Sequence, residues 1–189
     1  MASDTIMDKF ILHKESAALA VIDIQEKLVP AMKKRDQVYD NCGHLIELAK
    51  LINVPVVLTE QYPKGLGPTV PEIKDVLPSY EPLEKVTFDC CRGEGFLDKI
   101  ASLKKTHIII TGMETHICVL QTCLSLLREG YFVHLVRDAV CSRKKQDFNT
   151  AIETMRDAGA VITCTETALF QLLEKAGTPE FKAISKRIK

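Results

Sequence analysis

Runs of apolar residues rich in Val, Ile and Leu recur along the chain, and most are followed by a stretch with a different apolar spacing. Such runs predict buried β-strands at residues 17–23, 54–59, 83–88, 107–111, 131–137 and 160–164. Between them, apolar residues recur every three or four positions, which predicts amphipathic helices at 38–52, 96–103, 118–130, 152–159 and 168–173. Thr178 and Pro179 suit a helix cap and first helical position, so a short terminal helix is expected after them.

This repeated alternation of strand and helix predicts the fold class. Parallel strands need a crossover between them, usually a helix, so the pattern is typical of a three-layer αβα fold with a six-stranded, mostly parallel, doubly wound, Rossmann-like sheet. We expect a single domain over residues 1–189, with 1–14 as an N-terminal extension. Residues 60–71 are rich in Pro and Gly and are expected to form a shaped loop over the strand ends, where ligands bind in such folds.

Composition and charge narrow the classes of partner. Lys plus Arg and Asp plus Glu both number 25, and the basic clusters are short, so a nucleic-acid partner is not expected. The N-terminus carries acids and lacks an apolar core, and no apolar run approaches the roughly 20 residues that span a bilayer. We therefore expect a cytoplasmic protein without a membrane partner. The seven cysteines include no Cys-x-x-Cys pair, which argues against a disulfide framework and a structural zinc site.

Candidate chemistry gathers at the predicted carboxyl ends of the strands. Cys118 lies where the strand-like run ending near Gly112 gives way to a helix, and the positive end of a helix favours thiolate over thiol. Asp23 follows the first strand and is a candidate base, while Lys85 on the third strand is a candidate cation beside both groups. The turn 112–118 offers backbone N–H groups for a developing oxyanion.

Other interpretations of these residues remain open from the sequence. Asp23 is also suited to cap a helix, and Lys85 to be a solvated charge at a strand end. His116 is a rival base, although its place in a tight turn favours a structural or substrate-contact role. Glu60 and Asp89 are rival carboxylates that spacing does not separate from Asp23.

The remaining cysteines have simpler interpretations. A cytosolic cysteine most often packs as a small apolar residue. We expect that role for Cys42, Cys123 and Cys164, and a partly exposed position without a nucleophilic role for Cys90, Cys91 and Cys141.

Three separated segments resemble those of isochorismatase-like cysteine hydrolases: Ala20–Gln25, the strand that carries Lys85, and Gly112–Val119. The loop Thr59–Glu72 is similar to that of the isochorismatase domain-containing protein 2 subgroup, and the similarity extends over about residues 15–188. The resemblance implies the isochorismatase-like hydrolase fold and a catalytic triad of Asp23, Lys85 and Cys118. It also implies a cis peptide bond at Met113–Glu114, with the N–H groups of Glu114 and Cys118 forming an oxyanion hole.

Departures from the family pattern limit the substrate. Nicotinamidases carry an Asp-x-His metal motif after the second strand, but this chain has no histidine between 45 and 106, so we expect no metal, no cofactor and a substrate other than nicotinamide. A cysteine at 118 favours C–N hydrolysis over cleavage of the vinyl ether of isochorismate. Gln61, Tyr62 and His116 are the residues expected next to a small-molecule substrate. The resemblance also implies a homo-oligomer, a dimer or larger.

The resulting expectation is a hydrolase of a small amide-like substrate. A catalytically silent module that binds proteins or senses redox state is the alternative on the same fold. Nuclease activity is a remote alternative, because the chain has neither net positive charge nor interleaved aromatic residues.

Overall fold

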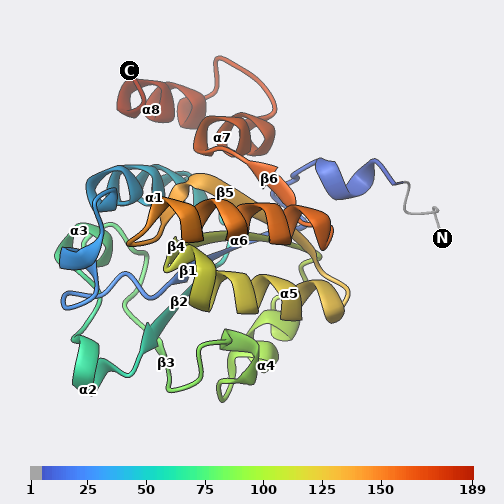
Figure 1. Ribbon diagram of the computed structural model, residues 1–189. Helices are drawn as coiled ribbons and strands as arrows, with labels where there is room; N and C mark the ends of the chain where they lie inside the picture. Colours follow the sequence, from blue (N-terminus) through green and yellow to red (C-terminus); the bar gives the residue numbers. More distant parts are fainter. Residues whose placement is uncertain (1–5) are drawn as a thin grey trace.

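The structure is a computed structural model that describes residues 6–189 and contains one six-stranded sheet (Figure 1). Its strands are β1 (Ala17–Ile22), β2 (Val56–Gln61), β3 (Leu83–Lys85), β4 (His107–Met113), β5 (Phe132–Cys141) and β6 (Val161–Thr163). They lie in the order β3-β2-β1-β4-β5-β6, and every neighbouring pair is parallel. The strand order reverses direction between β1 and β4, which is the arrangement of a doubly wound sheet and confirms the predicted fold class.

Helices cover both faces of the sheet. The longer ones are α1 (Arg35–Leu51), α4 (Phe96–Ser102), α5 (Leu120–Arg128), α6 (Lys145–Asp157), α7 (Thr165–Leu173) and α8 (Pro179–Arg187). Two apolar cores result, one under α1, α7 and α8 and the other under α4, α5 and α6 (Figure 1). Alternate residues of β1 enter the two cores: Leu19 and Val21 enter the first, whereas Ala20 and Ile22 enter the second. This explains why β1 is apolar at every position.

Short elements shape the connections. They are the helices α2 (Pro63–Leu66) and α3 (Pro71–Lys74), the 3₁₀ turns Asp8–Phe10, Val29–Ala31 and Cys90–Arg92, and the π-turn Thr115–Val119. The predicted loop 60–71 therefore contains the end of β2, all of α2 and the start of α3. Within residues 6–189, no helix combines the length and apolar character that a membrane span requires.

The strand β4 continues past the position at which it was predicted to break. Gly112 has φ +116°, and a Cβ atom there would lie 2.0 Å from the carbonyl oxygen of Ile22, its partner on β1. The glycine permits this close approach of two backbones, so β4 extends to Met113. The prediction that Gly112 ends the strand was wrong because the residue serves strand packing rather than a turn.

The ends of β3 and β5 also differ from the prediction. Residues 86–88 leave the sheet after β3, and their carbonyl groups accept hydrogen bonds from Gln61 and Lys85 instead. Asp138 lies within β5 rather than at its end. One oxygen of its carboxylate accepts hydrogen bonds from the backbone N–H and the hydroxyl of Thr165, both at 2.8 Å, and so caps α7.

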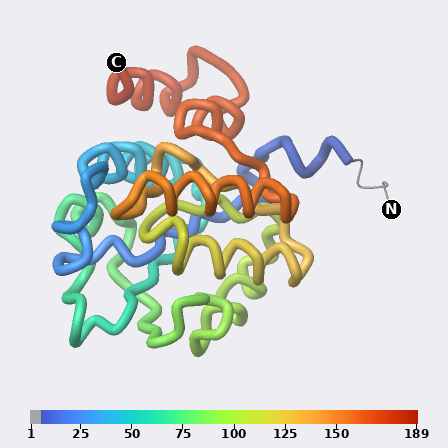
Figure 2. Tube along the Cα trace, in the orientation of Figure 1, coloured from blue at the N-terminus to red at the C-terminus, as the bar shows by residue number. Residues whose placement is uncertain are grey.

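The N-terminal segment extends away from the body of the molecule (Figure 2). Leu12 anchors this segment to the body: its side chain is buried, and its backbone N–H donates to Oε1 of Gln171 on α7 at 3.0 Å. Of the predicted extension 1–14, residues 1–5 lie outside the described part of the chain.

Candidate active site

Asp23 is fully buried directly after β1, in a left-handed backbone conformation with φ 53°. Both oxygens of its carboxylate have donors. The hydroxyl of Thr59 on β2 donates to Oδ1 at 2.7 Å, and Nζ of Lys85 donates to Oδ2 at 2.6 Å. Its carboxylate is therefore held between two neighbouring strands, and Asp23 does not cap a helix.

Lys85 is the last residue of β3 and is only 6% exposed, so it is not the solvated charge of the alternative interpretation. Besides Asp23, its ammonium group donates to Oε1 of Gln61 at 2.7 Å, with the carbonyl oxygens of Thr87 and Phe88 at 3.3 and 3.4 Å. Burial alone would lower the pKa of Lys85. The Asp23 carboxylate, together with Cys90 and Cys118, outweighs burial, so the pKa lies above its ordinary value and the ammonium stays charged.

Cys118 lies in the π-turn that leads into α5, and its side chain is buried. Burial raises the pKa of the thiol. The charge of the neighbouring Asp23 carboxylate raises it further, whereas Lys85 acts in the opposite direction. The thiol thus lies within electrostatic reach of the Asp23–Lys85 pair. The predicted helix start near Cys118 agrees with the structure, but the expected lowering of the thiol pKa was wrong, because burial and the neighbouring carboxylate raise that pKa.

The turn before Cys118 is fixed from the side of β5. The Met113–Glu114 peptide bond is cis, at the position that the family resemblance implied. The buried carboxylate of Glu114 accepts from the backbone N–H of Arg143 at 3.0 Å and from its guanidinium Nε at 3.1 Å. The side chain of Glu114 thus anchors the turn and is turned to Arg143.

The three residues predicted to touch the substrate have different surroundings. Gln61 is buried, and besides accepting from Lys85 it donates Nε2 to the carbonyl of Val86 at 2.8 Å. It therefore orients Lys85. Tyr62 is 53% exposed and has a left-handed backbone conformation, with φ +39°. Its ring packs against Gly65 so closely that a Cβ atom on residue 65 would lie 2.4 Å from the ring.

His116 is directed away from the thiol. Its Nδ1 lies 2.9 Å from the hydroxyl of Ser142, and its Nε2 lies 3.7 Å from a carboxylate oxygen of Asp147. Both ring nitrogens thus face residues of the segment after β5 and of α6. This supports the structural role that the tight turn favours over the role of base.

The two rival carboxylates also have partners of their own. Glu60 accepts from the N–H and hydroxyl of Thr69 and from the hydroxyl of Tyr80, all within 2.7 Å. Asp89 accepts from the N–H of Cys91 at 2.9 Å and from the hydroxyl of Ser125 at 2.7 Å. Of these three carboxylates, Asp23 is the one whose charge raises the pKa of the Cys118 thiol.

Sequence reasoning missed Thr59 and Cys90 as members of the site. Cys90 is fully buried, its Sγ lies 3.9 Å from the hydroxyl oxygen of Thr59, and its N–H donates to the hydroxyl of Thr122 on α5. Burial, and then the charge of Asp23, raises the pKa of Cys90 to about 12. The one available signal was strand alternation, which puts Thr59 and Gln61 on the same face of β2.

Several cysteines differ from their predicted exposure. Cys42 and Cys123 are in the core as expected, but Cys164 is exposed, whereas Cys90 and Cys141 are buried. Cys164 directly precedes α7, and Cys141 ends the buried strand β5. Among residues 6–189, no three His, Cys, Asp or Glu side chains are arranged to hold a metal ion.

Comparison with known protein families identifies the chain. The model of the Isochorismatase domain matches residues 17–167. The secreted isochorismatase effector Isc1 of Phytophthora sojae is 42% identical over 182 residues, which cover 94% of this chain and 87% of that protein. Isochorismatase domain-containing protein 2A of Mus musculus is 38% identical over 176 residues, which cover 93% of this chain and 84% of that protein.

Solved structures share the fold of this chain. The MAR1 ribonuclease of Caenorhabditis elegans has a TM-score of 0.88 at 37% identity, over 94% of this chain and 92% of that chain. YcaC from Pseudomonas aeruginosa, with hexane-2,5-diol and covalent acrylamide, has a TM-score of 0.88 at 27% identity, over 94% and 91%. YcaC from Escherichia coli, described as an octameric hydrolase of unknown specificity, also has 0.88, at 26% identity over 94% and 90%.

The region that matches the family model includes Asp23, Lys85 and Cys118, and the similarity to the two relatives extends over nearly the whole chain. The parallel, doubly wound sheet is the fold shared with these structures. The chain therefore belongs to the isochorismatase family and, within it, to the isochorismatase domain-containing protein 2 subgroup.

Proposed function

We propose that this protein hydrolyses a small amide-like substrate, or a related compound with a C–N bond, through Cys118. The observation that carries the proposal is the burial of a thiol, a carboxylate and an ammonium group together at the carboxyl ends of three strands, with Lys85 and Asp23 2.6 Å apart. A related protein of this fold holds a small amide, acrylamide, as a covalent adduct. Membership of a hydrolase family agrees with this chemistry.

The proton of Cys118 is the first requirement. Because burial raises the pKa of the thiol, little free thiolate forms near neutral pH. Asp23 is the carboxylate whose charge acts on this thiol, and it receives the proton as Sγ attacks the substrate carbon. The ammonium of Lys85 balances the charge of the carboxylate and of the thiolate that replaces it.

The remaining steps use the same groups. Attack moves an electron pair onto the substrate oxygen, and the backbone N–H groups of Glu114 and Cys118 are the candidate donors to that oxyanion. Asp23 returns its proton to the leaving amine as the C–N bond breaks, which leaves an acyl thioester on Cys118. Asp23 then removes a proton from water, and the attack of this water on the thioester releases the acid and restores the thiol.

A panel of small carboxamides tests the proposal, with ammonia or amine release as the readout. We expect at least one to be hydrolysed by the wild-type protein, and Cys118→Ala and Asp23→Asn to reduce kcat by at least about 10²-fold. Cys164→Ala is the matched control, because Cys164 is an exposed thiol outside the site. Unchanged hydrolysis in Cys118→Ala would show that another group attacks.

Ribonuclease activity is a second candidate, because similar structures from Caenorhabditis elegans and two Leishmania species bear that name. The net charge of zero and the buried acids at this edge of the sheet give a polyanion little attraction. We expect single-stranded RNA to remain intact with purified protein. Cleavage that Asp23→Asn abolishes would establish the ribonuclease instead.

A homo-oligomer and a catalytically silent role are tested on the same sample. The octameric relative from Escherichia coli supports assembly into a dimer or larger, which light scattering on the eluting protein measures directly. The catalytically silent alternative predicts that the protein hydrolyses no member of the panel but binds another protein, and that this binding requires Cys118.

A further inference from the structure

The buried charges of the protein are unevenly distributed. Among residues 6–189, the buried Lys, Arg, Asp and Glu residues are one lysine and four acids, namely Lys85, Asp23, Glu60, Asp89 and Glu114. All five lie at or just beyond the carboxyl ends of the four neighbouring strands β3, β2, β1 and β4. The buried residues at the edge of the sheet that carries the site therefore have a net negative charge.

The cation at this edge has no capacity left for a ligand. The ammonium group of Lys85 has three protons, and it already has Asp23 at 2.6 Å and Gln61 at 2.7 Å with two backbone carbonyls within 3.4 Å. The charge of Arg143 is paired with the buried carboxylate of Glu114, through its guanidinium Nε at 3.1 Å.

The acids differ in their distance from the thiol. The charge of Asp23 acts on the Cys118 thiol, and Glu114 lies four residues before Cys118 on the same turn. Glu60 alternates with Thr59 and Gln61 along β2 and so lies on the opposite face, where its charge acts at longer range. Asp89 caps the turn that carries Cys90.

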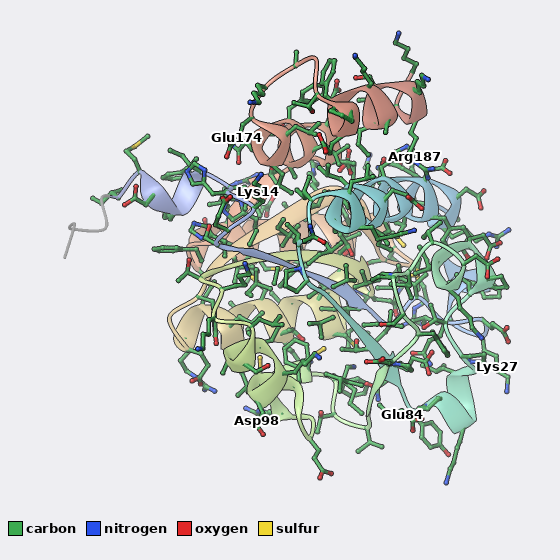
Figure 3. All side chains as sticks on the ribbon, turned by 180° about the vertical axis from the view of Figure 1, so that it is seen from behind. Lys14, Lys27, Glu84, Asp98, Glu174 and Arg187 are labelled. Atoms are coloured by element: carbon green, nitrogen blue, oxygen red, sulfur yellow. The ribbon has the colours of Figure 1, made fainter. Side chains whose placement is uncertain are left out.

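The rim beside α2 carries exposed charges of both signs, among them Lys27 and Glu84 (Figure 3). The buried groups bias the site more persistently, because salt screens buried charges less than surface charges.

We infer that the substrate of this site carries no anionic group: it is a neutral or cationic amide, and carboxylate-bearing compounds such as isochorismate are excluded. An anion entering beside Cys118 would lose its hydration without gaining an unpaired cation. A neutral amide needs only hydrogen-bond donors for its oxygen, which the turn provides. This inference rests on the proposed role of Cys118 as nucleophile.

Three thiol reagents that differ mainly in charge test the inference without a known substrate. They are hydroxyethyl, aminoethyl and sulfonatoethyl methanethiosulfonate, which are neutral, cationic and anionic. The rate at Cys118 is measured by quenching and peptide mapping, and is divided by the rate of the same reagent with mercaptoethanol. The exposed Cys164, read from the same digests, is the internal control.

We expect the anionic reagent to react with Cys118 at least about tenfold more slowly than the neutral one, with a much smaller difference at Cys164. Asp89→Asn keeps an acceptor for the N–H of Cys91 but removes one buried charge, so the difference should narrow. Arg143→Gln removes the cation beside Glu114, so the difference should widen.

Each outcome has a separate meaning. Equal or faster reaction of the anionic reagent at Cys118 overturns the inference and leaves the nucleophile in place. A thiol at 118 that none of the three reagents modifies overturns both the inference and the proposed function. If both variants are folded and neither changes the ratio of the anionic to the neutral reagent's rate at Cys118, any discrimination against the anion comes from the shape of the site. That result would overturn the electrostatic inference.

Discussion

Replacing Lys85 by Met isolates the contribution of the buried ion pair. Methionine preserves most of the apolar length of the lysine side chain but cannot donate to Asp23 or Gln61. The fully buried Asp23 carboxylate then keeps Thr59 as its donor but has no cation. The perturbation therefore creates an uncompensated charge with little change of volume.

The expected cost follows from these contacts. Leaving one partner of a buried ion pair uncompensated costs about 3–5 kcal/mol, and the orphaned Oε1 of Gln61 adds about 1 kcal/mol. The sum, about 4–6 kcal/mol, is a large part of the stability of an ordinary domain, about 5–15 kcal/mol. Adding Asp23→Asn removes the stranded charge, so the double variant should lie within about 1–2 kcal/mol of the wild type.

Urea unfolding followed by circular dichroism measures these differences. With a slope of about 2 kcal/mol/M, Lys85→Met should lower the unfolding midpoint by about 2–3 M. Because the pKa of Lys85 is raised, the stabilisation is fully present below its ordinary value of 10.5 and is lost as the pH rises through the raised value. A cost below about 1 kcal/mol, as for a surface pair, would refute the assignment of a buried, coupled pair.

Three further predictions concern single positions. Gly112→Ala should lower the free energy of unfolding by more than about 4 kcal/mol or prevent folding, because its Cβ atom would meet the backbone of β1. Gly159→Ala is the control: its φ is +106° but a Cβ atom there would meet nothing within 4 Å, so it should cost only about 1–2 kcal/mol. Similar thermal midpoints for the two variants would contradict this. Burial, and then His107, lowers the pKa of His134 from 6.5 to about 4. The stabilisation by neutral His134 should therefore be full above pH 6.5, and the free energy of unfolding should fall by up to about 3 kcal/mol as the pH drops through 4. A His134→Leu protein with the same loss of stability in acid would show that His134 is not its cause. Thr59→Val should lose about 1.5–3 kcal/mol in urea unfolding because it removes a donor to a buried carboxylate, and Thr59→Ser should retain most of it; equal losses would point to packing.

Features encoded by neighbouring residues were predictable from the sequence. The apolar run of β1 and the helical spacing after Cys118 are local patterns, and they put Asp23 at a strand end and the thiol at the entry of a helix. The parallel order then brings separate strand ends to one edge. The fold and the set of candidate residues at that edge follow from these patterns.

Features that depend on distant partners were not predictable. Gln61 was expected to face the substrate, but its oxygen is taken by Lys85, 24 residues later. Asp138 caps a helix 27 residues away. The direction of the Cys118 pKa depends on how deeply the turn is buried and on a carboxylate from another strand, neither of which local spacing reports.

The measurement closest to the central claim is the rate at which acrylamide, a neutral amide, alkylates each cysteine near neutral pH, read by peptide mapping in the wild type and in Asp23→Asn. We expect the buried Cys118 to react faster than the exposed Cys164, and Asp23→Asn to slow Cys118 by at least about tenfold while leaving Cys164 unchanged. If Cys164 reacts first, or if Cys118 reacts equally fast without the Asp23 carboxylate, then Cys118 is not a nucleophile activated by Asp23.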